Sequence, residues 1–187
     1  MKHLLYLLST VLLFFYAACS DSDNGIDMAW KNANDKAYQE IVDKPDYKEI
    51  KTKSGPSGVY YKPLDSISQM KGIEHPLHTS KVKVLYYGAY YDGTVFDAGS
   101  RIYNDKGELT EQTPPAPKSF LTSGTIRGFS FALQNMVVGD VWDIWIPYWL
   151  GYGETGYINP STGQVQIKAY SVLHFVVELV EITQYPQ

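Results

Sequence analysis

The sequence predicts an α+β fold in which an antiparallel β-sheet wraps around one short α-helix. Several stretches alternate apolar and polar residues with a period of two, which is typical of strands with one covered face. Between the strand-like stretches, residues 125–136 space their apolar side chains as a helix does. Glycine and proline residues separate the stretches, which indicates turns and loops between them.

Length and composition fit one globular domain with appendages, since the chain has 187 residues of which 44% are hydrophobic. The net charge is −4 and the lysines and arginines are dispersed, so no basic stripe indicates a nucleic-acid partner. Sixteen tyrosines and four tryptophans either fill a β-sheet core or line a ligand surface. The single cysteine, Cys19, excludes an internal disulfide framework and a cysteine-rich metal site.

Residues 1–18 predict a secretory signal peptide, because Lys2 precedes an apolar run that ends in small residues. The run is short for a transmembrane helix, which needs about 20 apolar residues. Residues 16–19, Tyr-Ala-Ala-Cys, resemble the bacterial lipobox, whose cysteine is acylated and becomes the mature N-terminus. We therefore expect a lipid on Cys19 that anchors the protein in the bacterial cell envelope, at the outer membrane. The alternative is an ordinary cleaved signal that leaves a free thiol.

Residues 19–57 are expected to form the lipidated tether and a helical spacer, and residues 58–187 the folded domain. Within the tether region, residues 27–43 predict a helix that Pro45 stops. This helix serves either as a packing and spacer element or as a dimer-forming one. Residues 51–58 predict a loop, rich in glycine and serine, before a short strand at 59–62. The apolar positions of the helix are Trp30, Ala33, Ala37, Tyr38 and Ile41.

Residues 82–97 are the stretch around which we expect the domain to be organised. Val82, Val84 and Tyr86 alternate with other residues as in a strand, and Gly88 is expected to end this run. A second run follows from 89, with a tight turn at 92–93. Asp97 then leaves the strand beside an aromatic ring, where it either lines an apolar pocket or only caps a turn.

The rest of the chain predicts a long loop or inserted hairpin at 98–117, strands at 118–121, 141–146 and 172–182, and the internal helix at 125–136. In the last strand, alternation places His174 on the outward face of the sheet. His75 and His78 could face one metal ion, but no third ligand has supporting spacing, so solvent-exposed loop histidines are expected.

Residues 151–156, Gly-Tyr-Gly-Glu-Thr-Gly, match the G-x-G-x-x-G pattern of dinucleotide sites. Such a site needs a strand before the motif and a helix after it. Here Asn159 and Pro160 follow closely, and no helix can start there. We therefore reject a nucleotide site at this position.

Four segments in order carry a resemblance to a known family. They are VLYYGAYYDGTVFDAG, GTIRGFSFALQNMVVGD, IPYWLGYG and IKAYSVLHFVVELVEI. Together they resemble FKBP-type peptidyl-prolyl cis-trans isomerases from about Val82 to Ile182. The resemblance implies an FKBP-like fold, isomerisation of X-Pro bonds and no cofactor or metal. It also implies proline-containing polypeptides as substrates and the macrolide ligands of the family as partners.

The resemblance implies a role for each matching residue. Tyr86 matches the strand tyrosine that touches the ligand ring, and Phe96 and Asp97 match a pair in the pocket wall. Thr125 and Ile126 match the two residues whose backbone meets the ligand before the helix, while Tyr152 matches the tyrosine whose hydroxyl bonds a substrate carbonyl. The remaining matches are Phe129 at the pocket floor, the loop residue Ile167 and the strand residue Phe175.

This chain also departs from the family. Phe129 replaces the usual floor tryptophan, Lys118 stands where an aromatic is common, and Gly151 and Lys168 replace the frequent alanine and proline. The loops at 101–117 and 157–166 are longer than in minimal members. We expect a lipid-anchored isomerase that assists the folding of exported proteins. A chaperone or binding module on the same fold is the alternative, and an envelope protein whose surface aromatics bind glycans is a third.

Overall fold

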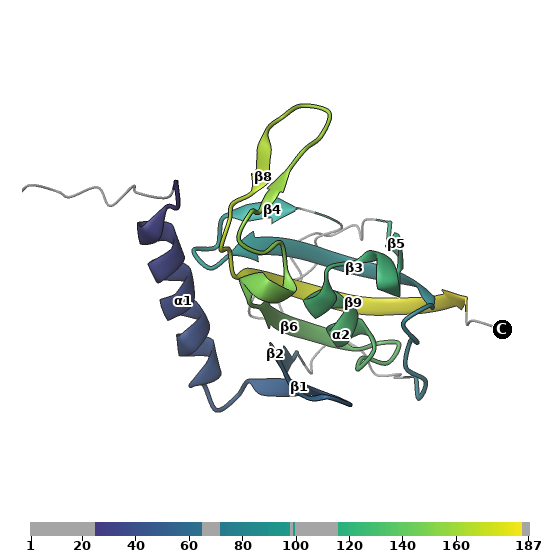
Figure 1. The fold of residues 1–187 in the computed structure, drawn as a ribbon. Helices are drawn as coiled ribbons and strands as arrows, with labels where there is room; N and C mark the ends of the chain where they lie inside the picture. The colour runs from purple at the N-terminus through teal and green to yellow at the C-terminus, as the bar shows by residue number, and fades with distance from the viewer. Residues whose placement is uncertain (1–24, 65–71, 98, 100–115, 185–187) are drawn as a thin grey trace, which may run out of the picture.

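The structure is a computed structural model, and it describes residues 25–64, 72–97, 99 and 116–184. An antiparallel sheet forms the body of the molecule, and the short helix α2 (Arg127–Leu133) lies against one of its faces (Figure 1). The predicted α+β arrangement of a sheet around one short helix is confirmed. Among the described helices, none is long and apolar enough to cross a membrane.

Seven strands make up the sheet, and every pair of neighbours is antiparallel. A separate two-stranded hairpin, β7 (Tyr157–Ile158) with β8 (Val165–Ile167), projects from the body (Figure 1). Single 3₁₀ turns, η1 (Thr122–Gly124) and η2 (Tyr148–Leu150), precede α2 and follow β6. The spatial order of the sheet is β1 (Lys48–Thr52), β2 (Gly55–Pro63), β6 (Val141–Ile146), β9 (Leu173–Gln184), β3 (Lys81–Tyr90) and β4 (Val95–Asp97), with β5 (Lys118–Leu121) also paired to β3.

The alternation read from the sequence separates the two faces of the sheet. One face carries Val82, Val84 and Tyr86 of β3 into the main core beneath α2. The other face carries Tyr87 and Ala89 into a smaller cluster with Val141 and Val176. Strands were predicted at 118–121 and 141–146, and β5 and β6 have those bounds.

The prediction that Gly88 ends the first strand is wrong. Strand β3 continues through Gly88 to Tyr90 and pairs with β9 along its whole length. The glycine is there for space, because a Cβ at this position would lie 2.7 Å from atoms of both Phe96 and Phe175. Gly88 therefore lets two aromatic rings cross the strand without breaking it.

Two further boundaries differ from the sequence prediction. Helix α2 is shorter than 125–136, because Thr125 is extended (φ −101°, ψ 169°) and its Oγ1 donates to the Thr122 carbonyl at 2.9 Å. Residues 51–58 are not a loop but the hairpin of β1 and β2. Pro56 is tolerated there because β2 pairs with β6 only from Tyr60 onward, so its first half has one neighbour.

Helix α1 (Met28–Val42) confirms the helix predicted at 27–43. It starts at Asp27, whose Oδ1 accepts the Trp30 backbone N–H at 2.9 Å. The helix packs beside the sheet (Figure 1). Trp30 Nε1 donates to Ser171 Oγ at 3.2 Å, and the fully buried Asn34 accepts the Val172 N–H at 2.8 Å. Of the two roles that the sequence left open for this helix, packing or dimer formation, these contacts support packing.

His174 differs from the outward-facing residue that was predicted. It does lie on the sheet face opposite α2, yet it is only 7% exposed. Its Nε2 is 3.1 Å from Asp143 Oδ1, and the Trp145 ring stacks on it at 4.5 Å. Asp143 also accepts the Tyr47 hydroxyl at Oδ2, at 3.0 Å. Side chains of the neighbouring strand β6 thus help to bury this outer sheet position.

Replacing Gly88 by alanine should destabilise the protein, because the new methyl group would overlap the rings of Phe96 and Phe175. Overpacking of this kind typically costs about 1–3 kcal/mol. Chemical denaturation of wild type and Gly88→Ala measures the loss in free energy of unfolding. Gly124→Ala is the matched control, because its nearest neighbour would be Leu121 Cβ at an ordinary 3.6 Å. Equal stability of the two variants would contradict the role given to Gly88.

Candidate active site

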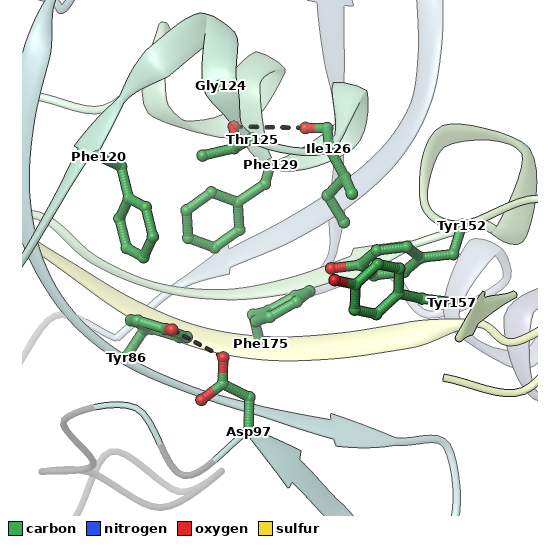
Figure 2. A pocket seen from close by; sticks show the side chains of 10 residues that line it. All are labelled: Tyr86, Asp97, Phe120, Gly124, Thr125, Ile126, Phe129, Tyr152, Tyr157 and Phe175. Atoms are coloured by element: carbon green, nitrogen blue, oxygen red, sulfur yellow. Dashed lines mark hydrogen bonds between the residues drawn. The ribbon is translucent and has the colours of Figure 1, made fainter. Parts of the chain in front are cut away.

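A cavity of about 470 Å³ lies between α2 and the face of the sheet that this helix covers, and we call it the front cavity (Figure 2). Strands β3 and β9, the residues before α2, and the chain after η2 each supply part of its wall. The residues that line it are Tyr86, Asp97, Phe120, Gly124, Thr125, Ile126, Phe129, Tyr152, Tyr157 and Phe175.

The structure brings most of the predicted site residues together. Seven of them line the front cavity: Tyr86, Asp97, Thr125, Ile126, Phe129, Tyr152 and Phe175. Phe96 and Ile167 instead line an adjoining cavity of about 480 Å³, which shares Asp97, Tyr152 and Tyr157 with the front one. Cys19, the predicted lipidation residue, lies outside the described residues.

Aromatic rings form the base of the front cavity. Phe129 reaches it from α2, is 5% exposed, and meets Phe175 edge-on with 5.1 Å between ring centroids. Tyr86 packs edge-on against Phe129 at 6.1 Å and against Phe120 at 5.6 Å. Such edge-to-face packing is favourable for aromatic rings and fixes their orientation. The base is therefore a rigid apolar surface.

Asp97 and Tyr86 are joined across β3 and β4. The Tyr86 hydroxyl donates to Asp97 Oδ2 at 2.7 Å, and the Gly99 N–H donates to Asp97 Oδ1 at 2.9 Å (Figure 2). Burial raises the pKa of Tyr86, and the hydrogen bond and negative charge of Asp97 raise it further. Tyr86 thus stays protonated and holds the carboxylate at the rim of the cavity.

Tyr152 presents a hydroxyl to the cavity. Its ring lies beside Tyr157 at 5.6 Å, and both hydroxyls point toward the centre (Figure 2). Within the described part of the chain the Tyr152 hydroxyl has no hydrogen-bond partner. Burial raises the pKa of Tyr152, and the nearby Asp97 and Tyr157 raise it further. Its hydroxyl therefore remains a donor. It is available to a carbonyl group of a bound molecule.

The glycines of residues 151–156 serve the turn that carries Tyr152. Among residues 157–184, which the structure describes, no helix follows the motif. Gly156 has φ +70°, and a Cβ there would lie 2.7 Å from the Ala169 nitrogen. Only glycine allows this close approach of two backbone segments. Gly156 therefore lets the turn that carries Tyr152 pack closely against the backbone of residues 167–169.

Thr125 and Ile126 close the side of the cavity before α2. The first helical hydrogen bond runs from Ser130 N to the Ile126 carbonyl at 3.0 Å. The Ile126 N–H lies ahead of this bond, at a helix end where backbone donors lack intrahelical acceptors. A peptide carbonyl could be held there.

Three lining residues were missed by sequence reasoning: Phe120, Gly124 and Tyr157. Phe120 lies in a four-residue strand, which is too short to show which face is covered. Tyr157 reaches the cavity only because β7 pairs with β8, where it lies opposite Ile167. The loop expected at 157–166 is this hairpin, and no local pattern in the sequence shows the pairing.

The histidines of the 72–80 segment are exposed, as predicted. His75 Nδ1 lies 3.0 Å from the Met136 carbonyl. Among the residues that the structure describes, no group of three or more His, Cys, Asp or Glu side chains could hold a metal ion.

A family model described as FKBP-type peptidyl-prolyl cis-trans isomerase matches residues 72–180, which is more than half of the chain. The chain belongs to this family. The sequence resemblance is thereby confirmed, and so is the FKBP-like fold class.

Individual relatives and solved structures show how far the likeness extends. A macrophage infectivity potentiator of Trypanosoma cruzi is 36% identical over 127 residues, 68% of this chain and 54% of that protein. An outer membrane protein MIP of Legionella longbeachae is 36% identical over 98 residues, 52% of this chain and 35% of that protein. A solved peptidyl-prolyl isomerase of Pseudomonas syringae superposes with a TM-score of 0.61 at 25% identity, covering 84% of this chain and 96% of that one. The chain spans about half or less of the length of these two sequence relatives.

The Tyr86–Asp97 hydrogen bond should be visible in the titration of Tyr86. We expect its phenol, followed through the ¹³Cζ resonance, to ionise above the ordinary value of 10.0. The native state then holds this proton more tightly than the unfolded chain does. The resulting stability is full below pH 10 and is lost as the pH rises above it.

Asp97→Asn is the matched variant, because it keeps an acceptor and removes the charge. The pKa of Tyr86 should fall in this variant but stay above 10, because burial is unchanged. An unaltered Tyr86 titration in Asp97→Asn would contradict the contact between the two side chains.

Proposed function

We propose that the front cavity catalyses cis–trans isomerisation of X-Pro bonds in exported polypeptides. The observation that carries this proposal is an aromatic cavity with the Tyr152 hydroxyl at its side, which has no hydrogen-bond partner among the described residues. Family membership supports the same reaction. Macrolide ligands of the family are proposed to compete for this cavity.

The reaction needs little from the protein beyond a suitable environment. Rotation about a peptide bond faces a barrier of about 18–20 kcal/mol, which amide resonance creates. Resonance places negative charge on the carbonyl oxygen, where water stabilises it. An apolar cavity removes that water and favours the twisted, less polar amide. Each tenfold gain in rate requires only about 1.4 kcal/mol.

The proposed roles follow from the positions of the side chains. The proline ring would rest on Phe129 and Phe175, with Tyr86 at its edge. Tyr152 would donate to a carbonyl of the substrate, and the backbone at Thr125 and Ile126 would hold another. Asp97 would form the polar rim, with Phe96 and Ile167 extending the wall into the adjoining cavity.

A chaperone or binding module on the same fold remains the second candidate, and one observation favours it. The β7–β8 hairpin exposes apolar side chains next to the front cavity, with Ile158 55% and Val165 63% exposed. Tyr157 joins this hairpin to the cavity wall. Such a surface could hold an apolar stretch of an unfolded chain whether or not isomerisation follows. A rate measurement separates the two functions.

The proposed location is the cell envelope, with a lipid on Cys19. The N-terminal charge, apolar run and lipobox-like residues 16–19 support it. One relative bears the name outer membrane protein MIP. Two or more acyl chains on one residue would anchor a protein stably to a bilayer. Helix α1 begins at Met28, so the anchor would hold the domain close to the membrane surface.

Tyr152→Phe and Asp97→Ala should each slow isomerisation of a proline-containing peptide by about tenfold. For Tyr152 the basis is one hydrogen bond to substrate that is stronger in the transition state than in the ground state. For Asp97 it is the loss of the polar rim and of the acceptor that orients the Tyr86 hydroxyl. A protease-free NMR exchange assay measures the rate, and thermal melting checks that both variants remain folded. Tyr148→Phe is the control, since it removes a hydroxyl that does not line the front cavity. Wild-type rates in both variants would place the reaction elsewhere.

Cys19→Ser should release the protein from the membrane fraction or block its processing, because serine cannot form the thioether of a lipoprotein. Fractionation of cells that express the two forms measures this, and mass spectrometry of the wild-type N-terminus should show the acyl chains. Recovery of wild-type mature protein in the soluble fraction without detergent would refute the anchor.

A further inference from the structure

A second cavity, of about 630 Å³, lies against the sheet face opposite α2, and we call it the back cavity. Strands β3, β6 and β9 form its floor, while the chain after α1 and the turn between β3 and β4 form its mouth. It shares no lining residue with the front cavity or the adjoining one. Its size is that of a small-molecule site. Isomerisation at the front cavity makes no use of it.

The floor of the back cavity holds a buried carboxylate that joins Tyr47 and His174. Asp143 is 2% exposed, and it accepts from the Tyr47 hydroxyl at 3.0 Å. Burial, and then the charge of Asp143, raise the pKa of Tyr47, so the phenol keeps its proton and donates it. The second oxygen of Asp143 lies 3.1 Å from His174 Nε2.

These contacts fix the tautomer of His174. A carboxylate can only accept, so the proton on Nε2 faces Asp143, and in the neutral imidazole Nδ1 is then an acceptor. Within the described residues Nδ1 has no hydrogen-bond partner, and His174 lines the cavity while being only 7% exposed. In this position Nδ1 can accept an O–H or N–H group of a bound molecule.

Aromatic rings hold the imidazole in place and provide apolar walls. Trp145 stacks on His174 with an interplanar angle of 17°, and Tyr87 meets it edge-on at 6.1 Å. Tyr47 and Tyr91 line the cavity closer to its mouth. A ligand here would contact ring faces and edges as well as the Nδ1 acceptor. The walls thus favour a molecule with both C–H surfaces and hydroxyl groups.

The mouth carries charges of both signs. The ammonium groups of Lys44 and Lys62 lie 5.9 and 5.1 Å from the Tyr47 ring centroid. Lys62 also lies 3.4 Å from Asp46. On the opposite side Asp92, whose Oδ1 accepts the Thr94 N–H, lines the cavity. Donors and acceptors are therefore mixed, which does not favour a purely anionic ligand.

The backbone around the floor excludes an extended peptide that would add a strand to the sheet. In β6, Trp145 pairs with Tyr60 of β2 on one side and with His174 of β9 on the other. In β9, His174 also pairs with Ala89 of β3. Strand addition requires an unpaired sheet edge, and these strands have none at the floor. Recognition must therefore come from side chains.

We propose that the back cavity binds a saccharide unit. Each sugar hydroxyl can donate and accept, so one hydroxyl bonds His174 Nδ1 while others bond Lys44 and Asp92 at the mouth. The C–H faces of the sugar ring pack on the aromatic walls. The back cavity would attach the protein to a glycan while leaving the front cavity open to a polypeptide.

The test uses the full chain in a detergent without a sugar headgroup. Glucose, galactose, N-acetylglucosamine and its β-1,4-linked dimer are titrated separately while the indole N–H of Trp145 and the imidazole of His174 are followed by NMR. At least one of the four should shift both groups of signals with a dissociation constant on the order of 1 mM or below. The Tyr152 signals, which report on the front cavity, should not move.

His174→Phe keeps an aromatic ring but removes the acceptor, and it should weaken binding at least tenfold. If this variant does not fold, Lys44→Ala provides the same test at an exposed position, with a loss of several-fold expected. Lys48→Ala, an exposed lysine outside the cavity, is the control and should bind as wild type. The proposal is overturned if no sugar shifts these signals or if both cavity variants bind as wild type. It is also overturned if a proline peptide, and not a sugar, produces the shifts.

Discussion

The pairing of β3 with β9 is the constraint on which the rest of the structure depends. Lys81–Tyr90 runs antiparallel to Gln184–Leu173, and these are the two longest strands of the sheet. Because side chains alternate along each strand, the same two strands serve both faces. Tyr86 and Phe175 face the front cavity, while Tyr87 and His174 face the back cavity. A shift of one residue in this register would exchange the two sets.

The front cavity is organised before any substrate arrives. Gly88 leaves the space into which the rings of Phe96 and Phe175 pack, and Tyr86 holds Asp97 through a hydrogen bond of 2.7 Å. The rings of Tyr86, Phe129 and Phe175 pack against one another edge-on or tilted and are mostly buried, so each helps to hold the others in place. For a reaction that depends on removing water from an amide, such a fixed surface matters more than any reactive group.

The fold was largely predictable because its central strands alternate cleanly and its helices have regular apolar spacing. Strands β5 and β6 and helix α1 follow directly from these patterns. The predictions for Gly88 and for residues 51–58 were wrong because glycine and proline usually mark turns. Here Gly88 makes room for two aromatic rings within a strand, and Pro56 lies in the part of β2 that pairs on one side only. Intrinsic preferences of single residues gave way to pairing with neighbours.

The candidate site was predictable where the family motif supplied the residues, as with Tyr86, Phe129 and Tyr152. It was not predictable where distant segments meet. Tyr157 reaches the cavity through a hairpin pairing, and His174 shares the carboxylate of Asp143 with Tyr47, a residue just after the N-terminal helix. Neither contact leaves a local pattern in the sequence.

The central claim is that one face of the sheet isomerises X-Pro bonds and the other face does not. The most direct measurement is NMR exchange spectroscopy of a short proline peptide with catalytic amounts of the wild-type protein, combined with mapping of the protein signals that the peptide shifts. The account predicts faster cis–trans exchange, with shifts at Phe129, Tyr152 and Phe175 and none at Tyr47, Trp145 or His174. Unchanged exchange, or shifts confined to the second group, would contradict it.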